Sequence, residues 1–289
     1  MPDYHIDGHK IVASAPPGGL YVVATPIGNL SDITLRALET LAGADIIACE
    51  DTRVSRKLLK RYTIQTPLIA YNEHNAAQIG PSLIEKLQSG QAVALISDAG
   101  TPLVSDPGHR LVVDAFAAGI RVVPIPGASA AIAALSASGM PVDNFLFSGF
   151  LPSKTSARKK RLEALARIPA TLIFYESPNR LGACLVDIAQ CLGPQRLVTI
   201  CREMTKLHEE FVSGNAEALA SRYHDEKVKG EIVLLVEPPT DRNEIDTSTL
   251  LADLLGEMSV SRAASEAAAI TGLPKRELYQ LALELAQDR

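Results

Sequence analysis

The 289-residue sequence has few aromatic and sulfur-containing side chains, and it has no tryptophan. Aromatic residues make up 4% of the chain, which argues against a protein that binds nucleic acid by stacking many bases. The four cysteines form no Cys-x-x-Cys pair, so we expect buried free thiols instead of a zinc site or a disulfide framework. No apolar run approaches the roughly 20 residues that a membrane-spanning helix needs.

Charge of either sign is not in large excess, because 28 Lys and Arg stand against 33 Asp and Glu, for a net charge of −5. Residues 240–289 contain 5 basic and 9 acidic side chains and so carry −4 of that charge. The rest of the chain is nearly neutral, so composition does not exclude a nucleic acid partner. The first 16 residues lack the basic and apolar segments of a secretory signal. We therefore expect residues 1–19 to form a flexible tail and the protein to be cytoplasmic.

Short apolar runs alternate with amphipathic stretches along most of the chain, which predicts an α/β fold with a mostly parallel sheet. The first set of runs is at 20–25, 44–50, 67–71, 92–98 and 121–126. The pattern breaks near Met140-Pro141 and resumes at 145–150, 170–176, 196–203 and 230–237. We expect two α/β domains, at residues 20–140 and 141–239, and then a small helical appendage at 240–289.

The appendage follows Pro238-Pro239 and an acidic linker at 241–246. Residues 259–283 contain an Ala-rich helix, a Thr-Gly-Leu-Pro turn and a second helix that begins with Lys275 and Arg276. This arrangement resembles a helix-turn-helix. The alternative is a helical hairpin that packs on the body or on a partner subunit, and so short a basic signal favours this alternative.

Ligands of parallel sheets bind beyond the carboxyl ends of the strands, so the loops at 25–32, 97–108, 124–131 and 175–180 are the candidate sites. These loops lack the GxGxxG and GxxxxGK[ST] patterns, which disfavours a dinucleotide fold and excludes a P-loop. In the loop at 97–108 we expect Asp98 to be functional and Asp106 to cap the next helix. Ser129 is a possible helix cap, and Glu176 needs a partner if it is buried.

Charged residues gather at two further strand ends and in two basic clusters. Glu50-Asp51-Thr52-Arg53 and Asn72-Glu73-His74-Asn75 follow predicted strands, where they serve either a polar substrate or a local turn. The first basic cluster shares one helical face, and together the clusters suggest a phosphate-bearing partner as an alternative to a solvated surface. The clusters are Arg53, Arg56, Lys57, Lys60 and Arg61, and Lys154, Arg158, Lys159, Lys160, Arg161 and Arg167.

Seven segments, in order, resemble the bacterial small-subunit ribosomal RNA cytidine 2′-O-methyltransferases of the tetrapyrrole-methylase-like superfamily. The segments are LYVVATPIGNLSDIT (20–34), CEDTR (49–53), SDAGTPLVSDPG (97–108), VVPIPGASA (122–130), GFLPSK (149–154), FYESPNR (174–180) and KGEIVLLVE (229–237). The resemblance implies two α/β domains of the tetrapyrrole-methylase type, with S-adenosylmethionine bound in a cleft between them. It also implies a homodimer that acts on 16S ribosomal RNA or the small ribosomal subunit, with no metal.

The resemblance also assigns the cofactor residues, while the catalytic and RNA-binding candidates follow from the chemistry of the reaction and from the basic clusters. The cofactor-binding set is Pro26, Ser97, Asp98, Ala99, Gly100, Thr101, Ala128, Ser129, Ala130 and Tyr175, with the backbone at Gly230-Glu231 a weaker candidate. A ribose 2′-hydroxyl needs a base before it attacks a methyl group. The catalytic candidates are Glu50, Asp51 and His74, with Asp98 as a further base and Arg53 to position a phosphate. The RNA-binding set is Arg56, Lys57, Lys60, Arg61, Lys154, Arg158, Lys159, Lys160 and Arg161.

Two other functions stay open at this point. A tetrapyrrole C-methyltransferase would share every cofactor residue, but relatives that modify tetrapyrroles have a glycine-rich first loop where this chain has Thr25-Pro26-Ile27-Gly28-Asn29. The second alternative is a DNA-binding regulator that combines the helix-turn-helix with a ligand-sensing α/β body.

Overall fold

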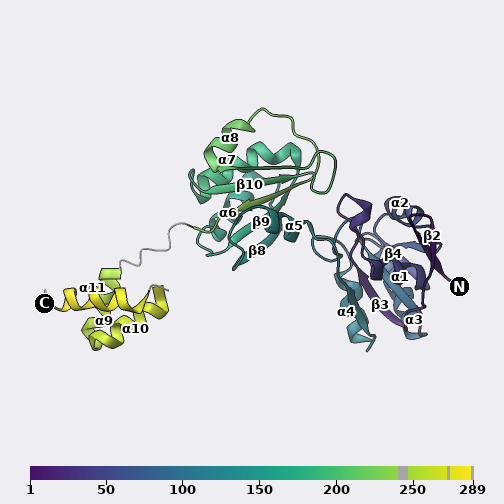
Figure 1. Ribbon diagram of the computed structural model, residues 1–289, viewed down its shortest axis with the longest axis horizontal. Helices are drawn as coiled ribbons and strands as arrows, with labels where there is room; N and C mark the ends of the chain where they lie inside the picture. Colours follow the sequence, from purple (N-terminus) through teal and green to yellow (C-terminus); the bar gives the residue numbers. More distant parts are fainter. Residues whose placement is uncertain (240–246, 272–273, 288–289) are drawn as a thin grey trace. The chain divides into compact units, whose positions relative to one another are not determined.

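The computed structural model describes residues 1–239, 247–271 and 274–287, and these fall into two compact units. The first unit, residues 1–166 and 170–238, contains two five-stranded sheets and a small two-stranded sheet. The second unit contains the three helices that follow residue 246 (Figure 1). The predicted linker at 241–246 and two residues of the predicted Thr-Gly-Leu-Pro turn lie outside the described residues.

The first large sheet is entirely parallel, in the order β5-β4-β6-β3-β7. It confirms the five strands predicted from the apolar runs, which are β3 (Gly19–Val23), β4 (Ile46–Cys49), β5 (Leu68–Ala70), β6 (Ala92–Ile96) and β7 (Val122–Ile125). Tyr21 and Val23 pack beneath one pair of helices, whereas Leu20 packs beneath the other pair, because successive strand residues point to opposite faces. The pairs are α1 (Leu35–Gly43) with α2 (Thr52–Arg61) and α3 (Ala76–Gln88) with α4 (His109–Ala117).

The order of these strands places two loops next to each other. β3 and β6 are neighbours, but the chain leaves β3 toward β4 on one side and leaves β6 toward β7 on the other. Such a reversal of direction opens a crevice at the carboxyl ends of the strands, where ligands of α/β proteins bind. Here the Thr25 N–H donates to the Gly100 carbonyl at 2.8 Å and the Gly100 N–H donates to the Thr25 carbonyl at 3.0 Å.

The second large sheet is mixed, in the order β11-β10-β12-β9-β8, and only β8 and β9 are parallel. Its strands are β8 (Phe145–Phe150), β9 (Thr171–Glu176), β10 (Leu197–Arg202), β11 (Glu210–Asn215) and β12 (Ile232–Val236). Strand β11 was not predicted, because this edge strand is half-exposed and has no continuous apolar run. The short helix α8 (Ala216–Arg222) was not predicted either.

Three helices alternate along the chain with strands of the second sheet: one precedes β8, one lies between β8 and β9, and one lies between β9 and β10. They are α5 (Ala130–Ala137), α6 (Thr155–Leu165) and α7 (Leu181–Leu192). Although α5 precedes the predicted boundary at residue 140, its Ala131, Ala134 and Leu135 pack against β9 and β12. We therefore use "N-terminal half" for residues 1–129 and "C-terminal half" for residues 130–239.

The prediction of a flexible tail over residues 1–19 is wrong. Strands β1 (Asp3–Ile6) and β2 (His9–Val12) form an antiparallel hairpin. Asp7 and Gly8 form its two-residue turn, and both have a positive φ. Tyr4 is buried in the core between the first large sheet and helices α1 and α2. The His5 N–H donates to the Tyr62 carbonyl at 2.8 Å. Asp-Gly between short alternating segments is a strong hairpin signal, and it was available in the sequence.

The structure also corrects the prediction for Arg158. Its side chain is 4% exposed, and its Nε lies 2.7 Å from the Oδ2 of Asp187, which is buried on α7. α6 packs on α7, so this face of the basic helix points into the protein, and Arg158 is not available to a phosphate at the surface. The Nζ of Lys159 also lies 3.7 Å from the Oδ1 of Asp187.

The second unit is built from α9 (Thr247–Glu257), α10 (Val260–Thr271) and α11 (Lys275–Gln287), which confirms a helical appendage. Its core includes Leu251, Leu278 and several alanines, whose small side chains allow the helices to approach closely. Lys275 and Arg276 are exposed in the first turn of α11. Among the described residues, no helix is long and apolar enough to cross a membrane.

Candidate active site

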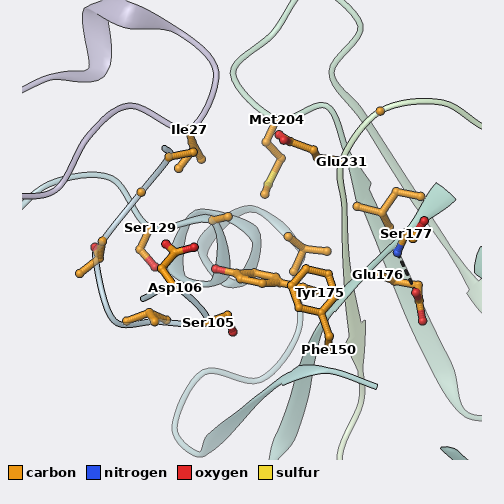
Figure 2. Close-up of a pocket in the computed structure, with 18 of the residues that line it drawn as sticks. Ile27, Ser105, Asp106, Ser129, Phe150, Tyr175, Glu176, Ser177, Met204 and Glu231 are labelled. Carbon is orange, nitrogen blue, oxygen red and sulfur yellow. Dashed lines mark hydrogen bonds between the residues drawn. The ribbon is translucent and has the colours of Figure 1, made fainter. Parts of the chain in front are cut away.

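A cavity of about 340 Å³ lies between the two halves of the first unit (Figure 2). The N-terminal half contributes the loops after β3, β6 and β7, and the C-terminal half contributes the start of α5, the end of β9 and the start of β12. This volume lies within the range of small-molecule and cofactor sites. We refer to it as the main cavity.

Small residues bring main-chain atoms to the wall of the main cavity. Gly100 has a φ of 78°, and a Cβ there would lie 3.3 Å from the Cγ2 of Ile27 and 3.7 Å from the Ala128 carbonyl oxygen. The Thr101 hydroxyl donates to that same carbonyl at 3.1 Å, which fixes the loop after β6 against the loop after β7. Small residues and apolar side chains such as Ile27 therefore form this part of the cavity wall.

Tyr175, at the end of β9, gives the cavity an aromatic wall. Its ring packs edge to face with Phe147 at 4.8 Å and with Phe150 at 5.5 Å between centroids. Burial raises the pKa of the Tyr175 hydroxyl, which therefore stays protonated at neutral pH. Figure 2 shows this hydroxyl on the side of the cavity that Asp106 lines.

Glu176 follows Tyr175 and has the partner that its burial requires. Its Oε1 lies 3.0 Å from the Nε of Arg180 and also accepts the Ser177 N–H at 2.7 Å. Arg180 donates in turn to the Leu151 carbonyl at 2.6 Å. These contacts fix the backbone after β9, so we interpret Glu176 as a residue that orients Tyr175 and not as a reactant.

Asp106 does not cap the next helix as predicted. α4 begins at His109 with Gly108 as its N-cap, because Pro107-Gly108 delays the start of the helix, and Asp106 lines the main cavity instead. Burial raises the pKa of Asp106, a hydrogen bond from Ser97 opposes the rise, and the nearby Asp98 adds to it. Leu103 and Ser105 beside it have φ values of 71° and 67°, a strained conformation that concentrates at functional sites.

A second cavity, of about 480 Å³, adjoins the first at Ser105 and Asp106 and also contains Glu50 and His74. We call it the acidic cavity. Burial raises the pKa of Glu50, and the charges of Asp98 and Asp106 raise it further. The fold thus brings together two of the predicted catalytic residues, from the ends of β4 and β5, and adds Asp106 to them.

Asp51 and Arg53 form a pair beside this cavity. Asp51 caps α2 by accepting the Arg53 N–H at 2.7 Å, and its Oδ2 lies 2.6 Å from the Nη2 of Arg53. Hydrogen bonds from the Arg53 side chain and backbone lower the pKa of Asp51 to about 2, which makes it a weak base. Asp98 accepts the Asp51 N–H at 3.0 Å and so fixes the loop after β4. Burial raises the pKa of Asp98.

The exposed cations of the two basic clusters lie outside the main and acidic cavities. Arg56, Lys60 and Arg61 are exposed along one face of α2, and Lys57 lines a third cavity of about 400 Å³. In the second cluster Lys154, Lys160 and Arg161 are exposed, and Arg161 donates to the Ser148 hydroxyl at 2.9 Å. The two clusters therefore remain candidates for contact with phosphate.

Comparison with known families decides the class of this site. Residues 19–220 match the family described as Tetrapyrrole (Corrin/Porphyrin) Methylases. The chain belongs to the tetrapyrrole methylase family. Residues 241–286 match the RsmI C-terminal HTH domain, which favours the helix-turn-helix interpretation of the methylase's second unit over the helical hairpin.

Relatives of this methylase carry one recurring name. The protein named "Ribosomal RNA small subunit methyltransferase I" of Mesorhizobium japonicum is 60% identical over 269 residues, which cover 92% of each chain. The protein of that name from Escherichia coli O157:H7 is 49% identical over 272 residues, or 92% of this chain and 95% of the relative.

Solved structures share the methylase fold at low identity. A uroporphyrin-III C-methyltransferase from Thermus thermophilus has a TM-score of 0.56 and 22% identity, covering 76% of this chain and 94% of its own. A diphthine synthase has a TM-score of 0.60 and 15% identity, covering 75% of this chain and 89% of its own. A structure of the T. thermophilus enzyme complexed with S-adenyl homocysteine has a TM-score of 0.53 and 20% identity, covering 75% and 97%.

The predicted cofactor residues of the methylase divide between neighbouring cavities. Pro26, Ser97 and Asp98 line the third cavity, which shares Ile27, Ala99 and Glu231 with the main one, and Ala128 presents its carbonyl to Thr101. Those in the main cavity are Ala99, Gly100, Thr101, Ser129, Ala130 and Tyr175.

Two residues of the main cavity were not predicted to be there: Asp106, which we expected to cap the next helix, and Met204. Met204 follows β10 in a turn without a recognisable signal, so only the fold brings it to the site.

We predict that Glu50→Gln makes the folded methylase more stable at neutral pH. The pKa of Glu50 is raised on folding, so between its ordinary and raised values the folded protein binds more protons than the unfolded chain. The free energy of unfolding therefore falls as pH rises through that window, and the ionised carboxylate lowers stability above it. Glutamine keeps the shape of the side chain and removes this charge.

Thermal unfolding followed by circular dichroism tests this prediction. We expect the variant to have the higher Tm at pH 7, and the difference to shrink below pH 4.5, the ordinary pKa of Glu, where the wild type is protonated as well. Glu85→Gln, an exposed change on α3, is the matched control. Equal Tm values for Glu50→Gln and wild type at every pH would contradict the prediction.

Proposed function

We propose that the protein transfers a methyl group from S-adenosylmethionine to the ribose 2′-hydroxyl of a cytidine in 16S ribosomal RNA. Relatives named ribosomal RNA small subunit methyltransferase I, at up to 60% identity over most of the chain, support methylation of small-subunit RNA. The observation that carries the finer proposal is the meeting of the main and acidic cavities at Asp106. This junction offers a donor site and an acceptor site with a carboxylate between them.

The main cavity is the proposed cofactor site. When bound, S-adenosylmethionine supplies an electrophilic methyl group on its sulfonium. The peptide groups of residues 99–101 and 129–130 bind the polar parts of the ligand, and Ile27, Ile232 and Val233 form apolar walls that exclude water. Because methyl transfer requires donor and acceptor in line, much of the catalysis comes from this orientation.

The acidic cavity is the proposed acceptor site, with Asp106 as the base that takes the 2′-hydroxyl proton. A base works best when its pKa lies near the working pH, and burial moves the pKa of Asp106 in that direction. Glu50 lines the same cavity, and burial together with the charges of Asp98 and Asp106 raises its pKa as well. Asp51 is a poor alternative because its pKa is about 2, and Asp98 already accepts a backbone N–H.

Other groups at the acceptor side would hold the RNA. His74 lines the acidic cavity, where its imidazole can donate to a phosphate or ribose oxygen. Arg53 is paired with Asp51, so it reaches a phosphate only if that carboxylate shares it. The exposed cations of α2, namely Arg56, Lys60 and Arg61, would contact the RNA backbone. Lys154 and Lys160 of the second basic cluster would do the same.

We also propose that the protein acts as a homodimer in the cytoplasm, where its RNA substrate is assembled. Val113 and Phe116 are 48% and 66% exposed and lie three residues apart on α4, so they share one face of the helix. Exposed apolar side chains of this size on one face support a contact with another chain.

Mass-spectrometric mapping of 16S RNA from cells with and without the protein tests the proposed reaction. We expect one cytidine to lose its 2′-O-methyl group in the deletion strain and to regain it when the gene is restored. Purified protein should transfer labelled methyl from S-adenosylmethionine to small-subunit particles or to their RNA. An unchanged modification map, or transfer to a porphyrinoid and not to RNA, would overturn the proposal.

Asp106→Asn should slow methyl transfer without weakening the binding of the cofactor. We expect kcat to fall by about 10²- to 10⁴-fold, as for loss of a general base. The Kd for S-adenosylmethionine, measured by calorimetry, should stay unchanged. The wild-type kcat should decrease as pH falls through the raised pKa of Asp106, and the residual activity of the variant should lack that decrease. Asp143→Asn, an exposed change, is the control, and an unaltered kcat in Asp106→Asn would exclude this residue as the base.

The exposed cations of α2 should contribute to the affinity for RNA without affecting the affinity for the cofactor. We expect the double variant Arg56→Glu/Lys60→Glu to bind RNA more weakly and to reduce the slope of log K against log salt by about 1 per lost phosphate contact. The matched comparison is Lys154→Glu/Lys160→Glu, which reverses two exposed charges in the second cluster. RNA affinity and salt dependence that remain at wild-type values in the α2 variant would remove α2 from the RNA surface.

A further inference from the structure

The turn between β10 and β11 contacts the opposite half of the first unit. The Thr205 hydroxyl accepts the N–H of Asn29, which belongs to the first loop of the N-terminal half, at 3.0 Å. Gly28 lies so close that a Cβ there would be 2.7 Å from both the Lys206 Cγ and the Thr205 Oγ1. The glycine of the Thr-Pro-Ile-Gly-Asn loop is therefore required by contact between the halves. We call residues 203–206 the clasp.

The backbone of the clasp is strained. Glu203 and Thr205 have φ values of 52° and 65°, a left-handed conformation that side chains other than glycine rarely adopt. Gly230 has a φ of 97°, and a Cβ there would overlap the side chain of Glu203. Strained conformations persist only where surrounding contacts hold them, so this turn needs a strong set of contacts.

Lys206 is at the centre of those contacts. Its Nζ lies 2.7 Å from Glu203 Oε1 and 2.9 Å from Glu231 Oε2, while Glu203 Oε1 also accepts the Glu231 N–H at 3.0 Å. Burial alone would lower the pKa of Lys206, but hydrogen bonds to the two glutamates outweigh it, and the pKa is raised. The amine is charged and already shared by two carboxylates, so it is poorly placed to bind an RNA phosphate.

The clasp and its ion-pair partner Glu231 both reach the ligand region. Met204 and Glu231 line the main cavity, and Figure 2 shows them together on one wall. Lys206 and Glu231 also line the third cavity, opposite Pro26 and Ser97. Movement of the clasp would therefore shift the walls of both cavities and the first loop at once.

We propose that Lys206 is a positioning residue for methyl transfer. By binding Glu203 and Glu231 together it keeps the clasp against the first loop, and this contact sets the spacing of the two halves around the main cavity. The inference rests on the proposed function only in taking that cavity as the S-adenosylmethionine site.

Lys206→Met tests this role, with Lys206→Arg as the conservative variant and Lys227→Met, at an exposed lysine, as the control. We expect Lys206→Met to raise both the Kd and the KM for S-adenosylmethionine about tenfold, with a smaller effect on kcat, because a displaced cavity wall loses contacts that the ground state and the transition state share. Lys206→Arg should restore most of the affinity, since arginine can also bind two carboxylates.

Hydrogen exchange provides a readout that needs no ligand. In the ligand-free Lys206→Met protein the amides of residues 24–30 should exchange faster than in wild type, while those of β4 and β6 stay protected. Gly28→Ala separates this effect from misfolding around Lys206, because its Cβ pushes the clasp away while the lysine remains. It should weaken cofactor binding in the same way, and its combination with Lys206→Met should be less than additive. Gly80→Ala, where a Cβ meets nothing within 4 Å, is the control.

The outcomes separate the two proposals. Wild-type affinity for S-adenosylmethionine and wild-type exchange at residues 24–30 in both Lys206→Met and Gly28→Ala would overturn the role of Lys206. Wild-type protein that binds no S-adenosylmethionine would overturn the proposed cofactor site, and the exchange data alone would then decide whether the clasp holds the first loop.

Discussion

The two hydrogen bonds between Thr25 and Gly100 are the contact on which the rest of the site depends. They join the loops after β3 and β6, two neighbouring strands whose chain connections leave in opposite directions. The loop after β6 then continues to Asp106, while the loop after β3 continues to Gly28 and the clasp. One point of sheet topology therefore brings the cofactor cavity, the carboxylates and the contact between the halves into one region.

This region is held at a cost to the stability of the folded chain. Asp98, Asp106 and Glu50 all have raised pKa values because burial disfavours their ionised forms. Left-handed backbone at Leu103 and Ser105 adds conformational strain in the same loop. The surrounding packed sheet supplies the stability that these residues do not, as in other proteins whose active sites are locally unfavourable.

The distribution of charge also follows the division of the chain. The acidic excess belongs to residues 240–289, whereas the body is nearly neutral and has exposed cations on α2 and α6. Within the body, ion pairs remove some cations from the surface: Arg158 binds Asp187 in the interior, and Lys206 binds two glutamates at the clasp. Cations that share a helix or a motif thus have different roles, which the count of basic residues does not distinguish.

Local patterns in the sequence were sufficient for the strands of the first sheet, the helical appendage and the small-residue loops around Gly100 and Ser129, because each depends on nearby residues. They were also sufficient for three of the four buried thiols, whereas Cys191 is only partly buried. They also assigned the family through motifs in register. Only the tertiary structure decided that Asp106 faces the cavity, that Arg158 is buried and that Lys206 bridges Glu203 and Glu231. These outcomes depend on which distant segments meet, and the direction of a side chain relative to another element has no signature in its own neighbours.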